Sequence, residues 1–600
     1  MAATASVGVA HVSYAPHASH LKLRLHLHNE QRTFFRPVDE KLDRVRYRLQ
    51  LLASNGSTGQ KYWKKKKQQQ KKKDKKGATG GTAPTVPVKF FNAEGNEISS
   101  KGATVGDALM RTTRLDIGTE TFVVLHNQPI VTGLKVLEPI MAGTTVIPLV
   151  ETEFFSVDEC LWQWFRLNEK DGVADENEER SKKVFVSTER RYTPTKDDIG
   201  YRFYVECRAP TADLSIEFAR DRKAERVTTP VLPGPNRDAF KDRIQMGLVA
   251  ATEKYPDAVD AFRVMSYNVL YDGYATSKNA QTNMFPYVKT RIMKESRRMQ
   301  LVLQEIEENN GDIVCLQEMG EHVYTRLFEP MLSLIGYHGF YSDKTGTTNE
   351  GCAIFIRTTR FEVVKEDTVD LTAAVKASTN PALQNLLRDF PEIAAGIKRI
   401  PSIAQILVLR SKVDPARSII LSNTHLFYRG DAHLIRLMQG AAVVECVSEQ
   451  KVVPGYEDAA VVMCGDWNAH PKAPLVAFLL DGEIDSTNSH WQEAPSFRWK
   501  TSQDDDTGAS SRVKIATRVR PNRLVHDLCL VSACGIPAFT NFVKSFVDTL
   551  DYIMVGSKAL QVRDAFPFFT EEEVSHEVAL PSSTFPSDHV SLVCDLSWQG

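Results

Sequence analysis

The 600-residue sequence lacks both long apolar runs and paired cysteines. No stretch of 18 consecutive apolar residues occurs, which argues against a membrane-spanning helix. The nine cysteines stand singly and form no CxxC pair, and several of them lie inside apolar runs. This pattern is typical of buried free thiols in a reducing compartment, and it does not indicate a disulfide framework.

Acidic residues are also missing from the beginning of the chain. The first 29 residues contain no Asp or Glu, a property that a mitochondrial presequence also requires. Residues 21–28, however, read LKLRLHLH, and this period-two alternation favours a β-strand over the amphipathic helix of a presequence. An import signal and a β-strand are therefore the two alternatives for this segment.

Length and charge suggest several folded units and one basic segment. Six hundred residues exceed what one hydrophobic core usually supports, so two or three units are expected. The net charge of −1 conceals a run at residues 61–76 with ten lysines and one aspartate. Because like charges repel, this run is expected to be a solvated tail, and it could also bind phosphate backbones without sequence preference.

Sequence patterns divide the chain into four parts. Residues 1–85 are expected to form a weakly ordered basic tail that ends in a Gly- and Pro-containing linker. Residues 86–230 contain short β-branched segments between turn residues, which predicts a β-sandwich-like domain. Residues 231–260 are expected to be a linker. Over residues 261–600, strand-like and helix-like segments alternate, which predicts one layered α/β domain with helices on both faces of a central sheet.

Polar residues recur where the strand-like segments of the last part begin or end. They are Asn268, Glu318, His425, Asp466, Asn468, Asp551, Asp588 and His589. Each of them alone is more often a turn, a cap or a satisfied core residue. If neighbouring strands carry all of them to one edge, burial of the set without a partner would be costly, and a cation is the natural partner.

Six short motifs stand in an order that resembles that of the endonuclease/exonuclease/phosphatase family. They are SYNVL, CLQEM, NTHL, GDWN, LDYI and PSDH. Residues 532–555 resemble its deadenylase branch. MAGTTVIP and YTPTKDDIGYRFYVEC are similar to the amino-terminal β-domain of the mitochondrial 2′,5′-phosphodiesterases of that branch. The resemblance covers about residues 86–600, and it implies a four-layer α/β/β/α sandwich as the catalytic domain.

The resemblance also implies the chemistry of the site. Magnesium-dependent cleavage of phosphodiesters would use Glu318 as the principal Mg²⁺ ligand, assisted by Asn268, with Asp588 at the metal or next to it. Asp466 would align or deprotonate the attacking water. Asn468 would donate a hydrogen bond to the scissile phosphate.

Two histidines complete the implied catalytic set. His589 would contact the phosphate or act as general base while Asp551 holds its ring, because such a pair fixes the tautomer and favours the cationic form. His425 would stabilise charge on the phosphoryl oxygens.

Two further residues are implied for substrate binding. Phe546, five residues before Asp551, would stack on a base, and Asn541 would assist it. A core position is the alternative for Phe546. The branch has a proline five residues after the NTHL histidine, and this chain has Gly430 there, which leaves a second wall around the base in doubt.

These implications lead to one principal expectation. The chain would be a Mg²⁺-dependent 3′-exoribonuclease that degrades 2′,5′-linked oligoadenylates and 3′,5′ poly(A) tails to AMP, with RNA as its partner and without a membrane or an obligate protein partner. A deadenylase restricted to 3′,5′ linkages is the alternative. A lipid or inositol phosphodiesterase and a non-catalytic RNA-binding protein are less favoured. The resemblance implies the mitochondrial matrix, and the cytoplasm is the alternative location.

Overall fold

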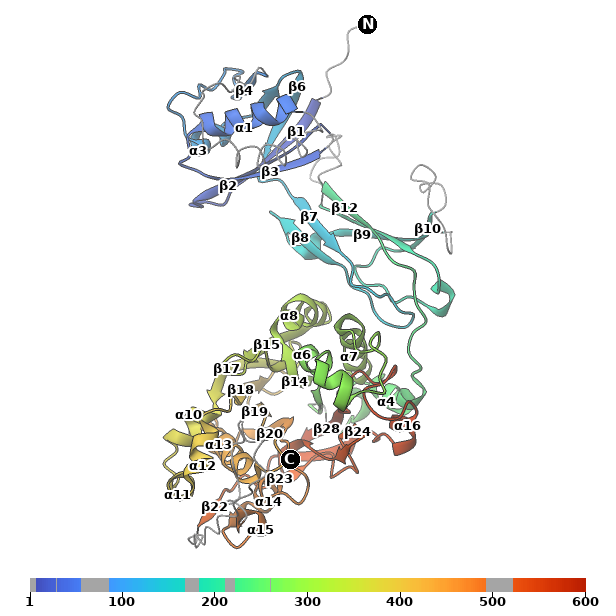
Figure 1. The fold of residues 1–600 in the computed structure, drawn as a ribbon, viewed down its shortest axis with the longest axis vertical. Coiled ribbons are helices and arrows are strands. Elements are labelled where there is room, and N and C mark those ends of the chain that lie inside the picture. Colours follow the sequence, from blue (N-terminus) through green and yellow to red (C-terminus); the bar gives the residue numbers. More distant parts are fainter. Residues whose placement is uncertain are drawn as a thin grey trace, which may run out of the picture. The chain divides into compact units, whose positions relative to one another are not determined.

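The computed structural model describes residues 7–28, 30–55, 86–167, 183–210, 222–258, 260–492 and 522–599. The chain forms two compact units (Figure 1). The N-terminal unit comprises residues 1–136, 148–192 and 200–230, and the C-terminal unit comprises residues 137–147, 193–199 and 231–600. Among the described residues, no helix is long and apolar enough to cross a membrane. All nine cysteines are free, and seven of them are buried.

The N-terminal unit begins with a six-stranded sheet in the order β3-β2-β1-β6-β5-β4. Its strands are β1 (Val7–Ser13), β2 (His20–Leu27), β3 (Glu30–Pro37), β4 (Val88–Phe91), β5 (Arg114–Ile117) and β6 (Glu120–His126). Helices α1 (Leu42–Asn55) and α3 (Val105–Leu109) share its core. The alternating leucines of β2 are buried on the core side of the sheet, as a period-two pattern requires.

The expected weak order of residues 1–85 is therefore wrong for residues 7–28 and 30–55. The basic charge and terminal position of this segment do not prevent folding, because the alternating leucines of residues 21–28 bury one face of β2 in a core. The lysine run at residues 61–76 lies outside the described residues.

The rest of the N-terminal unit is also built from strands. A four-stranded sheet has the order β10-β9-β11-β12, and β7 pairs with β8. The bounds are β7 (Ile130–Lys135), β8 (Leu149–Glu153), β9 (Leu161–Leu167), β10 (Lys183–Ser187), β11 (Phe203–Arg208) and β12 (Lys223–Val227), with short 3₁₀ turns at Val157–Glu159 and Lys196–Asp198. The predicted separate, β-rich N-terminal domain is confirmed.

The C-terminal unit contains two six-stranded mixed sheets. The first has the order β15-β16-β14-β13-β28-β27, and the second has the order β17-β18-β19-β20-β26-β23. The first sheet consists of β13 (Phe262–Asn268), β14 (Ile313–Gly320), β15 (Tyr337–Asp343), β16 (Glu350–Arg357), β27 (Leu560–Ala565) and β28 (Leu592–Trp598). The second consists of β17 (Phe361–Asp370), β18 (Ile403–Ser411), β19 (Ser418–His425), β20 (Ala460–Asp466), β23 (Leu530–Ser532) and β26 (Asp551–Gly556). Two two-stranded antiparallel pairs are separate from these sheets: β21 (Glu483–Asp485) with β22 (Arg523–Val525), and the hairpin of β24 (Asn541–Val543) with β25 (Phe546–Asp548).

Apolar side chains fill the space between the two sheets, and helices cover their outer faces. Val264 and Ile313 of the first sheet belong to the same buried cluster as Leu421 and Val462 of the second. The first sheet packs its other face on α7 (Glu295–Asn309) and α9 (Glu329–Ser333). The second packs on α10 (Leu371–Ala377), α11 (Pro381–Asp389), α12 (Pro391–Ile397), α13 (His433–Lys451), α14 (Pro474–Asp481) and α15 (Ser489–Gln492). Because both faces of these strands are buried, they are almost continuously apolar in sequence.

Shorter helices occupy the loops of this unit. They are α6 (Asp272–Ala275), α8 (Glu321–Val323) and α16 (Glu571–Ser575), with single π-turns at Ala280–Met284 and Tyr324–Phe328.

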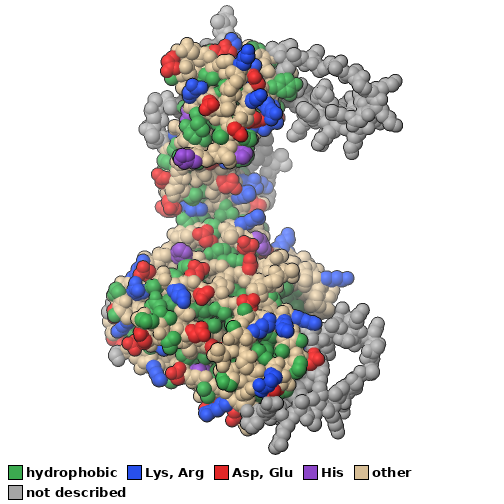
Figure 2. Space-filling view, turned by 90° about the vertical axis from the view of Figure 1, so that its left-hand side faces the viewer, with side chains coloured by type: hydrophobic (Ala, Val, Ile, Leu, Met, Phe, Trp, Pro, Cys, Tyr) green, Lys and Arg blue, Asp and Glu red, His purple; other side chains and the backbone are tan. Residues whose placement is uncertain are grey.

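On the face of the C-terminal unit that Figure 2 shows, acidic and basic side chains are interspersed.

The C-terminal unit also begins earlier than the sequence predicted. Residues 231–260 are not a linker, because they form a 3₁₀ turn (Asp238–Phe240), α4 (Lys241–Gly247) and α5 (Ala251–Lys254) within this unit. Arg243 of α4 is buried and donates hydrogen bonds to Ser591 O (3.1 Å) and Pro567 O (2.9 Å). These contacts join residues more than 300 positions apart, so the local Pro- and Gly-containing sequence, which is typical of a domain boundary, could not predict them.

Candidate active site

Strand register brings the predicted residues of the second sheet together. His425, Asp466 and Asp551 stand directly opposite one another on β19, β20 and β26. In the first sheet, the parallel strands β13 and β14 pair Asn268 with Gln317, one residue before Glu318. Because the carboxyl ends of parallel strands lie at the same edge, both sheets present their polar residues at one end of the unit.

Glu318 and Asn468 have unusual backbone conformations. Their φ angles are +57° and +49°, in the left-handed region that non-glycine residues rarely adopt. The register between β14 and β16 shifts at Glu318, between Gln317 and Met319, which is a β-bulge. Backbone strain of this kind persists where the surroundings enforce it, and it is frequent at active sites.

Asn268 links carboxylates from the two sheets. Its Nδ2 donates to Glu318 Oε1 (3.2 Å) and to Asp466 Oδ2 (3.0 Å), while Leu270 N donates to its Oδ1 (3.0 Å). The second oxygen of Glu318 accepts a hydrogen bond from Tyr271 N (2.9 Å). The structure therefore places Glu318 next to Asp466, although 148 residues separate them in the chain.

Burial disfavours the charged forms of Glu318 and Asp466, which also lie near other acidic residues. It raises the pKa of Glu318 to about 7, and the charges of Glu350 and Asp588 add to the effect. It also raises the pKa of Asp466 to about 7, together with the charge of Asp551. Carboxylate oxygens dominate this part of the site, so Glu318, Asp466 and Asp588 fit a hard divalent cation, which would offset the charge. Asn268 lies beside them with its Nδ2 toward the carboxylates and its Oδ1 toward Leu270 N.

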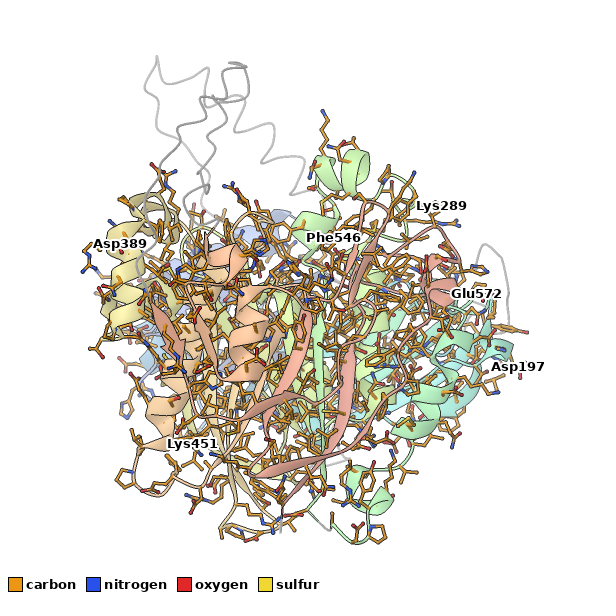
Figure 3. All side chains as sticks on the ribbon, turned by 90° about the horizontal axis from the view of Figure 1, so that it is seen from below. Asp197, Lys289, Asp389, Lys451, Phe546 and Glu572 are labelled. Atoms are coloured by element: carbon orange, nitrogen blue, oxygen red, sulfur yellow. The ribbon has the colours of Figure 1, made fainter. Side chains whose placement is uncertain are left out.

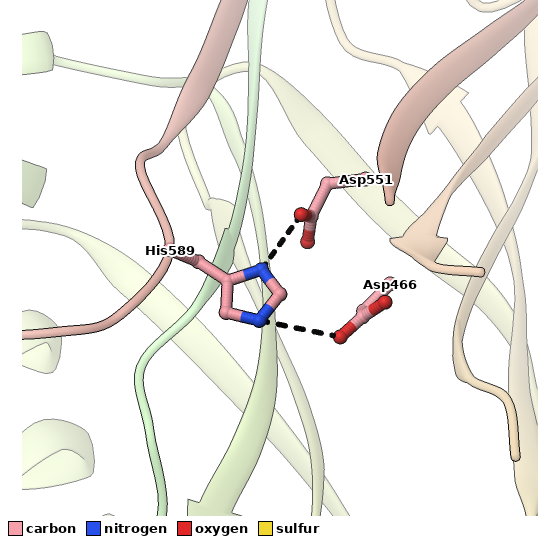
Figure 4. A group of neighbouring side chains, drawn as sticks. All are labelled: Asp466, Asp551 and His589. Atoms are coloured by element: carbon pink, nitrogen blue, oxygen red, sulfur yellow. Dashed lines mark hydrogen bonds and ion pairs between the residues drawn. The ribbon is translucent and has the colours of Figure 1, made fainter. Parts of the chain in front are cut away.

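His589 is held between two carboxylates (Figure 4). Its Nδ1 is 2.7 Å from Asp551 Oδ2, and its Nε2 is 3.7 Å from Asp466 Oδ2. Ligand atoms of these three buried residues lie within 4.8 Å of one another. Burial alone would lower the pKa of His589, but the charges of Asp551 and Asp466 outweigh it and raise that pKa well above its usual value. The pair therefore favours an imidazolium.

His425 faces the same space from the other side of Asp466. Its Nε2 is 3.7 Å from Asp466 Oδ2 and 4.0 Å from Glu318 Oε1. On its far side, Lys344 Nζ is 3.0 Å from His425 Nδ1. Burial, with the charge of Lys344, lowers the pKa of His425 well below its usual value. The two histidines of the site therefore have opposite electrostatic surroundings.

The loop that carries Asp588 and His589 is tied to the end of β13. Ser587 Oγ donates to Asn268 O (2.7 Å) and accepts a hydrogen bond from His589 N (3.1 Å). Asn541 pairs with His589 through an isolated β-bridge, and its Nδ2 donates to Asp588 Oδ2 (3.4 Å). Asp588 and Asn541, both predicted from sequence, are thus part of the same cluster.

Asn468 is oriented by the strand next to its own. Its Nδ2 donates to Leu426 O (3.0 Å), and its backbone N donates to Asp466 Oδ1 (2.9 Å). Gly430, farther along the same loop as Leu426, is exposed, and a Cβ atom there would meet nothing within 4 Å. The structure therefore provides no second wall at that position.

Phe546 lies on the surface rather than in the core. Its exposed fraction is 46%, and Figure 3 shows it at the opposite end of the C-terminal unit from Lys451, the last residue of α13. It begins β25 and pairs with Val543, two residues beyond Asn541, which is roughly 7 Å along the strand. The hairpin thus carries an exposed aromatic ring near the cluster.

Two residues of the cluster were not predicted from sequence. Glu350 is fully buried at the first position of β16, and Lys344 lies in the preceding loop. Glu350 precedes the apolar run of β16 by a single glycine, so the pattern of polar residues at strand ends could have indicated it. Lys344 carries no signal in the sequence, because its role depends on the loop's path.

Two family profiles match the chain. The profile of the Endonuclease/Exonuclease/phosphatase family matches residues 265–589, more than half of the chain. The profile described as "2',5'-phosphodiesterase 12-like, N-terminal domain" matches residues 128–230, a range that contains both β-domain stretches quoted above.

Curated relatives match most of the chain. The proteins named 2',5'-phosphodiesterase 12 of Homo sapiens and Bos taurus are 30% and 31% identical over 499 residues, covering 81% of this chain and 76% of each relative. Carbon catabolite repressor protein 4 homolog 1 of Arabidopsis thaliana is 26% identical over 462 residues, covering 69% of this chain and 70% of that protein. The chain belongs to the endonuclease/exonuclease/phosphatase family, as a 2′,5′-phosphodiesterase 12-like, metal-dependent phosphodiesterase of its deadenylase branch.

Proposed function

We propose that this phosphodiesterase is a Mg²⁺-dependent 3′-exoribonuclease that degrades 2′,5′-linked oligoadenylates and 3′,5′-linked poly(A) tails to AMP. The observation that carries the proposal is the joint match of residues 128–230 and 265–589, since the first match is to a domain described as 2',5'-phosphodiesterase 12-like. The relatives named 2',5'-phosphodiesterase 12 support the 2′,5′ linkage, and the relative named CCR4-Not complex 3'-5'-exoribonuclease subunit Ccr4 supports 3′-exoribonuclease action on RNA.

Magnesium would be held chiefly by Glu318, with Asn268 and Asp588 beside it. When bound, the ion would act as a Lewis acid on the scissile phosphoryl group and offset the negative charge of the site. Burial raises the pKa of Glu318 to about 7, so without a cation this carboxylate would be only partly ionised at neutral pH. A bound cation would stabilise the ionised form, which supports the proposal.

Asp466 would align or deprotonate the attacking water. It is buried at the end of β20 and receives hydrogen bonds from Asn268 Nδ2 and Asn468 N, which hold its oxygens in fixed directions. His589, oriented by Asp551, would contact the phosphate and move protons at its Nε2 atom, which faces Asp466. Asp551 would then orient the His589 ring and stabilise its positive charge.

The remaining residues would bind substrate. Asn468 offers a neutral N–H donor to the phosphate, where another carboxylate would repel it. His425 would stabilise charge on the phosphoryl oxygens. Phe546, half exposed on its hairpin, would stack on an adenine, and Asn541 would position the strand that carries it.

Product analysis tests the proposal directly. Purified protein with Mg²⁺ should convert 2′,5′-linked and 3′,5′-linked triadenylate to AMP in parallel reactions. Intact 2′,5′-triadenylate, with another phosphodiester digested in the same preparation, would contradict the claim about the substrate while leaving the enzyme class untouched.

A deadenylase restricted to 3′,5′ linkages is the second candidate. It is favoured by the similarity to a relative named CCR4-Not complex 3'-5'-exoribonuclease subunit Ccr4, and the ratio of the two cleavage rates separates it from the first. The mitochondrial matrix remains the proposed location, with the cytoplasm as alternative, and imaging of the tagged full-length chain decides between them.

A further inference from the structure

Lys344 and Glu350 form a buried pair behind His425. Only 10% of the Lys344 side chain is exposed, and Glu350 is fully buried. Lys344 Nζ is 2.5 Å from Glu350 Oε1 and 3.0 Å from His425 Nδ1, and Tyr274 Oη donates to the same Glu350 oxygen (3.3 Å). Glu350 therefore fixes the ammonium group in front of the imidazole.

The hydrogen bond from the Lys344 ammonium group fixes which ring nitrogen of His425 carries the proton. An ammonium group has three N–H donors and no acceptor, so His425 Nδ1 must accept the hydrogen bond from Lys344. An imidazole whose Nδ1 accepts carries its proton on Nε2. An imidazolium would set two N–H donors against each other and place a second positive charge beside Lys344.

We propose that Lys344 and Glu350 are positioning residues that hold the His425 ring through a hydrogen bond to Nδ1, with its Nε2–H directed into the site as a donor to the phosphoryl oxygen of the substrate. The directed atom lies 3.7 Å from Asp466 Oδ2 and 4.0 Å from Glu318 Oε1, at the centre of the cluster. A donor fixed in advance stabilises charge that develops in the transition state without reorganisation.

The same geometry separates the work of the two histidines. His589 presents Nδ1 to Asp551 and keeps Nε2 toward Asp466, which suits proton transfer. His425 is excluded from proton transfer because Lys344 holds its other nitrogen. Opposite surroundings of two titratable groups commonly mark such a division. The inference rests on the phosphodiesterase activity and not on which linkage is cleaved.

A double-mutant cycle tests this role. We expect Lys344→Met to lower kcat by roughly 10- to 100-fold with little change in KM, measured with an oligoadenylate that the wild type cleaves. Lys344→Arg should restore most of the activity, because arginine is also a donor without an acceptor. In a His425→Ala background, Lys344→Met should cost nothing further. Lys412→Met is the control, since Lys412 is exposed directly after β18 and should leave kcat unchanged.

Nitrogen-15 NMR of histidine-labelled protein gives a readout that a merely structural role would not move. The His425 signals are identified by their loss in His425→Ala. In the wild type we expect a protonated Nε2 and an unprotonated Nδ1, and in Lys344→Met a loss of this fixed pattern. Losses of kcat that multiply in the double variant, or a wild-type proton on Nδ1, would overturn the proposal. With the signals assigned from folded His425→Ala, the wild-type spectrum decides even if the Lys344 variants fold poorly or the substrate differs.

Discussion

A single buried arginine holds together the two loops that carry much of the site. Arg298 of α7 is fully buried. Its Nη1 donates to Val269 O (3.1 Å) and Pro586 O (3.0 Å), and its Nη2 donates to Leu270 O (2.9 Å). Two of these carbonyls directly follow Asn268, and the third directly precedes the loop with Asp588 and His589. We therefore expect Arg298 to set the distance between the two loops.

The substitution Arg298→Met keeps most of the side-chain volume and removes the donors. Four buried carbonyls then lose this donor, since Arg298 Nε also donates to Met293 O (3.3 Å), and at about 1–1.5 kcal/mol each the free energy of unfolding should fall by about 4–6 kcal/mol. The loops should also shift, and a displacement of about 1 Å at the reacting groups costs on the order of 100-fold in rate. Urea unfolding measures the first quantity, and kcat of the folded fraction measures the second.

Arg410→Met is the matched control for this experiment. Arg410 lies on β18, its side chain is 41% exposed, and it forms one ion pair with Glu362 (3.5 Å), which is worth at most about 1 kcal/mol. If Arg298→Met lowered stability no more than Arg410→Met and left kcat unchanged, Arg298 would not hold the loops in place.

Three further outcomes are expected. Asn423→Leu should lower the free energy of unfolding by about 2–4 kcal/mol in urea titrations, because Asn423 donates to Gln405 Oε1 (3.1 Å) and accepts from Gln317 Nε2 (2.8 Å) between the sheets; an unchanged midpoint would contradict this. Phe546→Ala should raise KM for oligoadenylate by roughly 5- to 150-fold with kcat little changed, whereas Val547→Ala on the same strand should not; equal effects would remove the stacking role. Deletion of residues 61–76 should reduce the salt dependence of RNA affinity in binding assays at several salt concentrations and barely alter turnover of a trimer; an identical slope would show that the lysine run does not touch RNA.

The position of polar residues at strand ends could be predicted from the sequence, for a physical reason. The run that ends at Asp466 is buried along its whole length, so the polar residue that closes it marks where the strand leaves the core. The order of these ends along the chain then indicates one shared edge. The predicted mixed α/β catalytic domain and the separate β-rich domain are confirmed for the same reason, since both rest on the lengths and periodicity of apolar segments.

Features that depend on tertiary contacts were not predictable. The alternation of strands and helices does not reveal that the strands form two sheets rather than one. The left-handed conformation of Glu318 and the path of the Lys344 loop arise from packing and leave no pattern. The helices in residues 231–260 were hidden because α4 and α5 are short and are stabilised by contacts such as that of Arg243 with Ser591.

The binding position of a divalent ion is the most direct check on the proposed convergence of Glu318, Asn268, Asp466 and Asp588. Anomalous diffraction from crystals soaked in Mn²⁺ locates the ion, and Mn²⁺ titration followed by electron paramagnetic resonance measures its affinity. We expect a peak at the Glu318 carboxylate and a loss of affinity of at least about 10-fold in Glu318→Gln. A peak remote from Glu318, or unchanged affinity in the variant, would contradict the assignment of this cluster as the metal site.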